Sequence, residues 1–141
     1  KGLLYMTRAV APLMAERKSG HIFNIGSIAG KEAYENGNVY CATKAAVASL
    51  SKSMRIDLLK DNIKVTHIAP GMAETEFSLV RFKGDSERAD NVYKGIDALT
   101  GNDIASIIFW CATLPWHICI NDLEVTPTQQ ASVVHNVRRQ A

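Results

Sequence analysis

The chain has 141 residues, of which 47% are hydrophobic and 21% are charged, and its formal net charge is +2 at pH 7. This composition is typical of one globular domain and argues against a disordered or low-complexity chain. The small net charge argues against electrostatic binding of nucleic acid. The longest apolar stretch, residues 104–114, is well short of the roughly 20 residues that cross a bilayer. We therefore expect neither a nucleic-acid nor a membrane partner.

The first part of the chain is predicted to form a helix, a strand and a second helix. Residues 3–18 show apolar side chains at helical spacing, and Pro12 among them is expected to bend the helix or break one turn. Residues 21–25 are predicted to form a short strand. After a loop rich in Gly, Ser and Asn, Asn38 is the expected N-cap of a long helix over residues 39–60.

The remainder continues the alternation. The β-branched run at residues 63–69 predicts a strand. Residues 72–99 have mixed charge and little periodicity, which predicts a loop with short helices. Residues 100–103 are expected to cap a helix over 104–114, and residues 121–126 a last strand. Alternating helices and strands predict an α/β fold with a parallel sheet, whose ligands bind beyond the carboxyl ends of the strands.

The cysteines and tryptophans give no sign of a special site. Cys41, Cys111 and Cys119 are odd in number and lack zinc-ligand spacing, so we expect free thiols in a reducing compartment. The four histidines are scattered, and we expect no metal site. Trp110 and Trp116 flank the end of an apolar helix and are expected to serve as core or subunit contacts.

Three residues in the predicted loops and helices suit proton transfer. Ser27 follows the first strand, and Tyr40 and Lys44 stand four residues apart on the next helix, so they share a face. A Tyr hydroxyl, with an ordinary pKa of about 10, is a poor base until a neighbouring cation lowers that pKa. With Ser27 holding a substrate oxygen, the set suits proton transfer at an alcohol or carbonyl group. An exposed Tyr beside a solvated Lys is the alternative interpretation.

The sequence around these residues adds specificity. Residues 24–27 (Asn-Ile-Gly-Ser) follow a strand, residues 40–46 (Tyr-Cys-Ala-Thr-Lys-Ala-Ala) open a helix, and the next strand ends in Pro70 and Gly71. In this order the motifs resemble the carboxyl-terminal half of a short-chain dehydrogenase/reductase. The resemblance implies an α/β fold with a Rossmann-type, doubly wound parallel sheet that binds NAD(H) or NADP(H).

The resemblance also implies that only half of that domain is present in residues 1–141. The family's glycine-rich phosphate-binding turn does not occur in the sequence, and the family's catalytic Asn is expected just before Lys1. We therefore expect the chain to be the carboxyl-terminal half of one domain, with a substrate-loop region at about residues 72–99. On its own, this piece is expected to be inactive.

Roles for individual residues follow from the same resemblance. Tyr40 is expected to be the general acid/base, Ser27 to hydrogen-bond the reacting oxygen, and Lys44 to lower the pKa of Tyr40 and bind the nicotinamide ribose. Backbone groups of the Pro-Gly turn are expected to shape the nicotinamide pocket. The expected cofactor-binding residues are Tyr40, Lys44, Pro70, Gly71, Met72 and Thr75.

Further motifs, at residues 2–8, 37–40 and 75–85, resemble a bacterial branch of the family, the NADP-dependent 3-hydroxy acid dehydrogenases that also oxidise serine and L-allo-threonine. This branch implies NADP as cofactor, with NAD possible, a homotetramer or dimer, and a cytoplasmic location. Arg81 is then expected to bind the carboxylate of a 3-hydroxy acid; the alternative is a surface Arg on a lid helix. The loop over residues 70–75 is expected to be one residue shorter than in the branch.

Two other functions stay open at this level. One is a short-chain dehydrogenase/reductase that acts on a different alcohol or ketone. The other is a truncated, non-catalytic relative that serves as a binding or assembly module.

Overall fold

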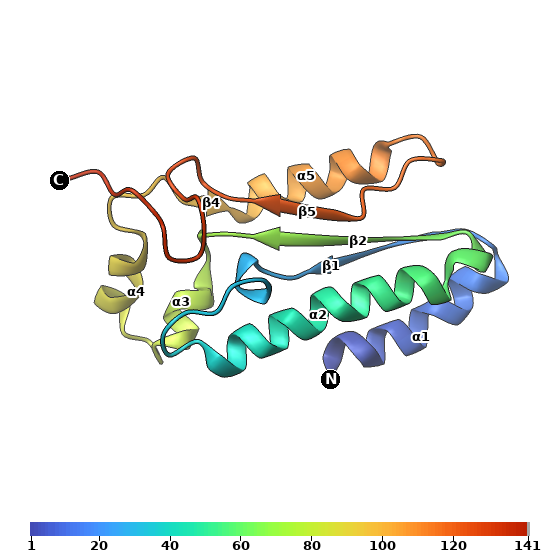
Figure 1. The fold of residues 1–141 in the computed structure, drawn as a ribbon, viewed down its shortest axis with the longest axis horizontal. Coiled ribbons are helices and arrows are strands. Elements are labelled where there is room, and N and C mark those ends of the chain that lie inside the picture. Colours follow the sequence, from blue (N-terminus) through green and yellow to red (C-terminus); the bar gives the residue numbers. More distant parts are fainter. Residues whose placement is uncertain (141) are drawn as a thin grey trace.

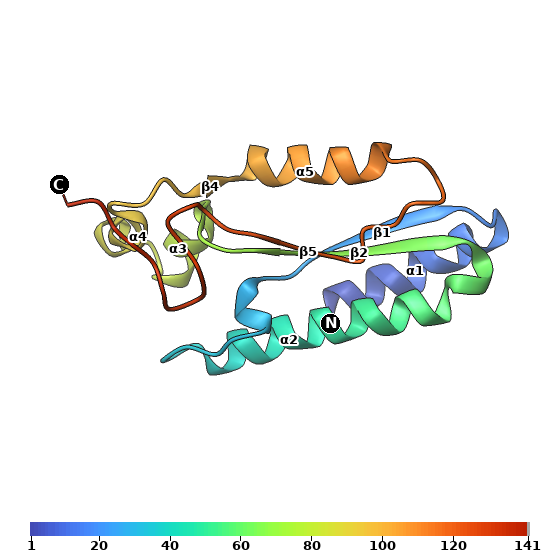
Figure 2. The same cartoon turned by 45° about the horizontal axis from the view of Figure 1, so that its top comes forward.

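A computed structural model describes residues 1–140, and Figures 1 and 2 show a parallel sheet with helices on both faces. Helix α5 covers one face, and α1 and α2 cover the other. The strands, in spatial order, are β1 (Gly20–Ile25), β2 (Ile63–Pro70) and β5 (Asp122–Val125). The helices are α1 (Gly2–Glu16), α2 (Asn38–Asp57) and α5 (Gly101–Thr113).

The core is centred on β2, which pairs with β1 on one side and with β5 on the other. Every residue of β2 is buried, and Val65 and Ile68 are 0% exposed. A strand covered on both faces is apolar along its whole length rather than at alternate positions, and this explains the β-branched run in the sequence. Within residues 1–140, β1 pairs with β2 alone, so its other edge is open.

Two helix predictions differ from the structure. Helix α1 runs unbroken from Gly2 to Glu16 with Pro12 inside it. Pro12 and Arg8 are both exposed, so the Arg8 carbonyl that loses its hydrogen bond remains open to water. Asn38 is the first residue of α2, and Gly37 is its N-cap. The Asn38 side chain accepts from the N–H of Val39 at 2.6 Å, so it does not serve as the cap.

The predicted cap of α5 is confirmed. Thr100 is the N-cap, and its side chain accepts from the N–H of Asp103 while the Asp103 carboxylate accepts from the N–H of Thr100. This reciprocal capping box satisfies two donors that the first helical turn leaves free. The helix itself begins at Gly101, three residues before the predicted start.

The segment between β2 and α5 contains short helices, as predicted. They are α3 (Glu76–Arg81) and α4 (Ser86–Tyr93). Two short parallel strands, β3 (Ala73–Glu74) and β4 (Leu99–Thr100), close the segment at its base. The Tyr93 hydroxyl lies 2.7 Å from Ser78 Oγ and donates to the carbonyl of Ala73 at 3.0 Å. These bonds join α4, α3 and β3 into one unit beside the sheet.

The surface of the described chain is rich in apolar side chains. Helix α1 buries none of its residues, and Trp110 and Trp116 are 51% and 44% exposed, so neither tryptophan belongs to the core. The three cysteines are free thiols, as predicted. Among residues 1–140, no helix has the length and apolar character to cross a membrane, and no cluster of three His, Cys, Asp or Glu side chains could hold a metal ion.

Candidate active site

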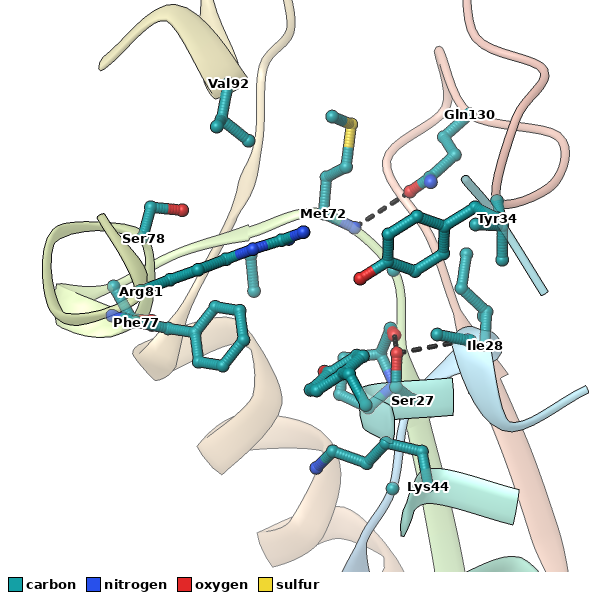
Figure 3. Close-up of a pocket in the computed structure, with 18 of the residues that line it drawn as sticks. Ser27, Ile28, Tyr34, Lys44, Met72, Phe77, Ser78, Arg81, Val92 and Gln130 are labelled. Carbon is teal, nitrogen blue, oxygen red and sulfur yellow. Dashed lines mark hydrogen bonds between the residues drawn. The ribbon is translucent and has the colours of Figure 1, made fainter. Parts of the chain in front are cut away.

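A cavity of about 640 Å³ opens where β1 and β2 end, at the carboxyl edge of the sheet. Its wall comes from these two strand ends, the start of α2, helices α3 and α4, and the segment after β5 (Figure 3). Open parallel sheets bind their ligands at this edge, and the volume suits a small-molecule site. The structure brings all the residues predicted for the site to this cavity: Ser27, Tyr40, Lys44, Pro70, Gly71, Met72, Thr75 and Arg81.

Ser27 is fixed at the end of β1 by hydrogen bonds to its surroundings. Its hydroxyl accepts from the N–H of Ala29 at 3.1 Å and donates to the carbonyl of Pro70 at 3.4 Å. The first bond caps a short 3-10 helix at residues Ile28–Gly30. Ser27 Oγ is therefore held between the ends of β1 and β2, facing the cavity.

Gly26 permits a close approach of the chain just before Ser27. Its N–H donates to the carbonyl of Ile68 at 2.7 Å, which continues the β1–β2 ladder. A Cβ atom at this position would overlap the imidazole of His67. His67 is 1% exposed, and its Nδ1 lies 3.1 Å from Asp122 Oδ1 on β5. The position of Ser27 thus depends on a glycine packed against a buried, tethered ring.

Tyr40 and Lys44 lie on the first turns of α2 and face the cavity, as their spacing predicts. Lys44 Nζ is 5.7 Å from the centroid of the Tyr40 ring and donates to the carbonyl of Ile25 at 3.3 Å. The Tyr40 ring lies 5.4 Å from the ring of Phe77 on α3, measured between centroids. Tyr40 is therefore held between α2 and the short helix opposite.

The pKa of Tyr40 differs from the prediction. Burial raises it above the ordinary value of 10.0, and the nearby Ser27 hydroxyl and the Arg81 charge act to lower it. Lys44 is not among the groups that lower it, and burial lowers the pKa of Lys44 itself from 10.5. In the part of the chain that the structure describes, no hydrogen bond joins the Lys44 ammonium group to the Tyr40 hydroxyl.

The Pro-Gly turn at the end of β2 forms the back of the cavity. The N–H of Gly71 donates to the carbonyl of Val125 at 2.7 Å, and that of Met72 donates to Gln130 Oε1 at 2.8 Å. Thr75 Oγ1 accepts from the N–H of Phe77 at 3.2 Å and caps α3. The turn is thus tied to β5 and to the segment that follows it.

Arg81 is the last residue of α3, and its side chain is exposed. Its guanidinium carbon lies 5.7 Å from the centroid of the Tyr34 ring and 5.5 Å from that of Phe82. Figure 3 shows the guanidinium and the Tyr34 hydroxyl pointing toward the space above Ser27. Arg81 and Lys44 are thus the two cationic side chains that line this cavity.

Several cavity residues were not predicted. Tyr34 comes from the loop before α2, Phe77 from α3, and Gln130 and Val133 from the polar segment after β5. Tyr34 lies in a loop that follows a strand end, so its position in the sequence was a usable signal. Gln130 and Val133 carried no signal, because only the return of the chain past β5 brings them to this edge.

The donor groups fit the nicotinamide end of a dinucleotide cofactor. Lys44 carries three N–H donors, one of which is directed to Ile25. Its other donors suit ribose hydroxyls, and the cavity is large enough for a flat ring beside Tyr40. The Pro70–Met72 turn also lines the cavity, and because Gly71 has no side chain, its backbone is accessible to a ligand.

The sequence pattern of the family described as short chain dehydrogenase matches residues 1–85. The chain is 51% identical over 141 residues to the NADP-dependent 3-hydroxy acid dehydrogenase YdfG of Escherichia coli, covering 99% of this chain and 57% of that protein. It is 44% identical over 140 residues to the serine 3-dehydrogenase of Rhizobium radiobacter, covering 99% of this chain and 56% of that protein.

A solved structure, the closed form of serine dehydrogenase complexed with NADP+, superposes with a TM-score of 0.91 at 51% identity and covers 99% of this chain and 56% of that one. The chain thus spans a little over half the length of the proteins it matches. The predicted Rossmann-type α/β fold, with half of the domain described, is confirmed by this superposition. The matched residues 1–85 include Ser27, Tyr40, Lys44 and the Pro-Gly turn. The chain therefore belongs to the short-chain dehydrogenase family.

Proposed function

We propose that the chain forms the catalytic half of an NADP-dependent oxidoreductase that interconverts a small 3-hydroxy acid and its carbonyl product. The observation that carries this proposal is the meeting of Ser27, Tyr40 and Lys44 in one cavity that also contains Arg81. The similarity to NADP-dependent 3-hydroxy acid and serine dehydrogenases supports NADP over NAD and a 3-hydroxy acid such as serine as the substrate. L-allo-threonine and 3-hydroxypropionate are further substrates that we propose.

In this mechanism Tyr40 moves the proton of the substrate hydroxyl. In the oxidation direction its phenolate accepts that proton, and in reduction its hydroxyl returns it. Ser27 Oγ is held at the end of β1, and its O–H would turn from the Pro70 carbonyl to the same substrate oxygen and orient it toward Tyr40. The chemistry that bound NADP supplies is hydride transfer at the substrate carbon. Lys44, Tyr40 and the Pro70–Met72 turn would hold its nicotinamide end, and Thr75 lies on the same wall.

Arg81 gives the cavity its preference for an acid. A guanidinium group binds a carboxylate through two parallel N–H donors. The lining contains two cationic side chains, Lys44 and Arg81, and one carboxylate, Glu35. The excess of positive charge suits an anionic substrate, with its carboxylate at Arg81 and its hydroxyl at Ser27 and Tyr40.

The remaining parts of the proposal concern the whole protein. We assign residues 1–141 to the carboxyl-terminal half of one dinucleotide-binding domain, with residues 72–99 as the substrate loop. The exposed apolar side chains on α1 (Leu4, Tyr5, Met6) and on α5 (Phe109, Trp110) suit subunit contacts in a dimer or tetramer. Three free thiols suit a cytoplasmic location.

The test is a substrate panel on the complete enzyme that contains this chain. We expect oxidation of L-serine, L-allo-threonine and 3-hydroxypropionate with NADP, and slower turnover with NAD. Turnover of uncharged alcohols alone would leave a dehydrogenase of another substrate class. If the intact protein has a mass of 15.5 kDa, folds and turns over none of these substrates, the proposal is wrong and a non-catalytic module remains.

A further inference from the structure

Gln130 is a buried polar side chain in the cavity wall that the proposed mechanism leaves unused. It belongs to the segment after β5, is 5% exposed and lines the cavity. The backbone holds it at two points: its N–H donates to the carbonyl of Pro127 at 2.9 Å, and it forms an antiparallel bridge with Asn136. The side chain is therefore placed before a ligand arrives.

One half of the Gln130 amide is already engaged. Its Oε1 accepts from the N–H of Met72 at 2.8 Å, a bond visible in Figure 3. Because a backbone N–H requires an acceptor, this contact fixes which branch of the amide is oxygen. A Cβ atom on Gly71 would overlap Oε1, so the glycine makes this approach possible.

The other half of the amide, Nε2, makes no hydrogen bond within residues 1–140. In that part of the chain, His67 Nε2 is the one side-chain nitrogen or oxygen atom that is both fully enclosed and without a partner. Gln130 Nε2 has no partner and is not an enclosed atom of this kind, so part of its surface is accessible, and Gln130 lines the cavity. It offers two free N–H donors at the cavity wall, from which a ligand group or water can accept.

The charge of the wall indicates which ligand group would accept. Lys44 and Arg81 outnumber Glu35, so the cavity favours an anion. A carboxylate has about four acceptor positions on its two oxygens, and the two-pronged Arg81 guanidinium uses about two of them. We infer that Gln130 Nε2 donates to the substrate carboxylate alongside Arg81 and is a specificity-determining residue for hydroxy acids. This inference rests on the proposed function.

The variant Gln130→Glu tests it, because it keeps the oxygen that binds Met72 and replaces the N–H donors with a second oxygen. The substrates are 3-hydroxypropionate and its uncharged analogue 3-hydroxypropionamide, assayed with the complete enzyme and NADP. We expect KM for the acid to rise at least about tenfold. KM for the amide should stay the same or fall, because a carboxylate can accept from its N–H groups. KM for NADP should change less than about twofold.

Two further variants keep the inference falsifiable. Thr128→Glu, at an exposed position outside the cavity lining, adds the same charge nearby and should leave the ratio of the two KM values unchanged. If Gln130→Glu does not fold, as judged by thermal unfolding, then Gln130→Met should still raise KM for the acid more than for the amide.

The outcomes separate this inference from the function on which it rests. A native enzyme inactive with every hydroxy acid would remove both. An active native enzyme whose two KM values respond equally to Gln130→Glu overturns the inference alone. A rise in KM for NADP in place of KM for the acid also overturns it, because the amide would then bind the cofactor.

Discussion

Replacing Gly26 by Ala should destabilise the enzyme and displace Ser27. The added Cβ would overlap the imidazole of His67, and this ring cannot easily move. It is 1% exposed, its backbone lies in the central strand β2, and its Nδ1 is 3.1 Å from Asp122. Overpacking of such a site costs about 1–3 kcal/mol.

The loss of stability can be measured by thermal and urea unfolding of the complete enzyme. For a domain of about 150–250 residues, a loss of about 1–3 kcal/mol corresponds to a fall in Tm of about 2–12 °C. Because Ser27 follows directly, a shift of its hydroxyl by about 1 Å should also lower kcat up to about 100-fold. Gly101→Ala is the matched control, since a Cβ at the start of α5 meets nothing within 4 Å.

The contact itself is tested by a double-mutant cycle with His67→Ala. Removing the ring should relieve the overlap, so the double variant should be more stable than the sum of the two single losses by about 1–3 kcal/mol. Additive losses, or a Gly26→Ala variant as stable as the native enzyme, would refute the reasoning.

Three further predictions concern the titrating and charged groups. Tyr40→Phe should lower kcat/KM about 10²–10⁴-fold and weaken NADP binding far less, because Lys44 and the Pro70–Met72 turn remain. Because burial raises the pKa of Tyr40 above 10.0, oxidation by the native enzyme should accelerate with pH across the alkaline range. Arg81→Met should raise KM for 3-hydroxypropionate far more than for uncharged alcohols, and an equal rise for both would contradict its carboxylate role. Burial and Lys64 lower the pKa of His21 from 6.5 to about 4. Because protonation of His21 then favours the unfolded chain, the free energy of unfolding should fall as the pH drops from 6.5 to about 4. Urea titrations at each pH should show a less steep fall in His21→Gln.

Local rules made the elements and the positions of Ser27, Tyr40 and Lys44 predictable. Tyr40 and Lys44 share a face because an α-helix brings residues four apart together. Ser27 was placed by its position just after a strand, and Thr100 by the side-chain chemistry of a helix cap. These features depend on neighbours within a few residues, so the sequence contains all the information that they need.

Three local predictions failed where exposure, a competing hydrogen bond or burial decided the outcome. Pro12 was predicted to bend α1 or break one of its turns, and the helix is unbroken because this side of it is open to water. Asn38 was predicted as the cap, but its side chain binds the adjacent N–H. The pKa of Tyr40 was predicted to fall, and it rises because burial outweighs the neighbouring groups.

By itself, the sequence determined an α/β chain of the short-chain dehydrogenase type, and it indicated Ser27, Tyr40 and Lys44 as the proposed catalytic residues. Only the tertiary structure decided what surrounds that centre. Gln130 stands 58 residues after Met72, and His67 meets Gly26 across two strands. Contacts between segments so far apart in the chain follow from how the sheet and the last segment pack, and periodicity or motif spacing does not encode that packing.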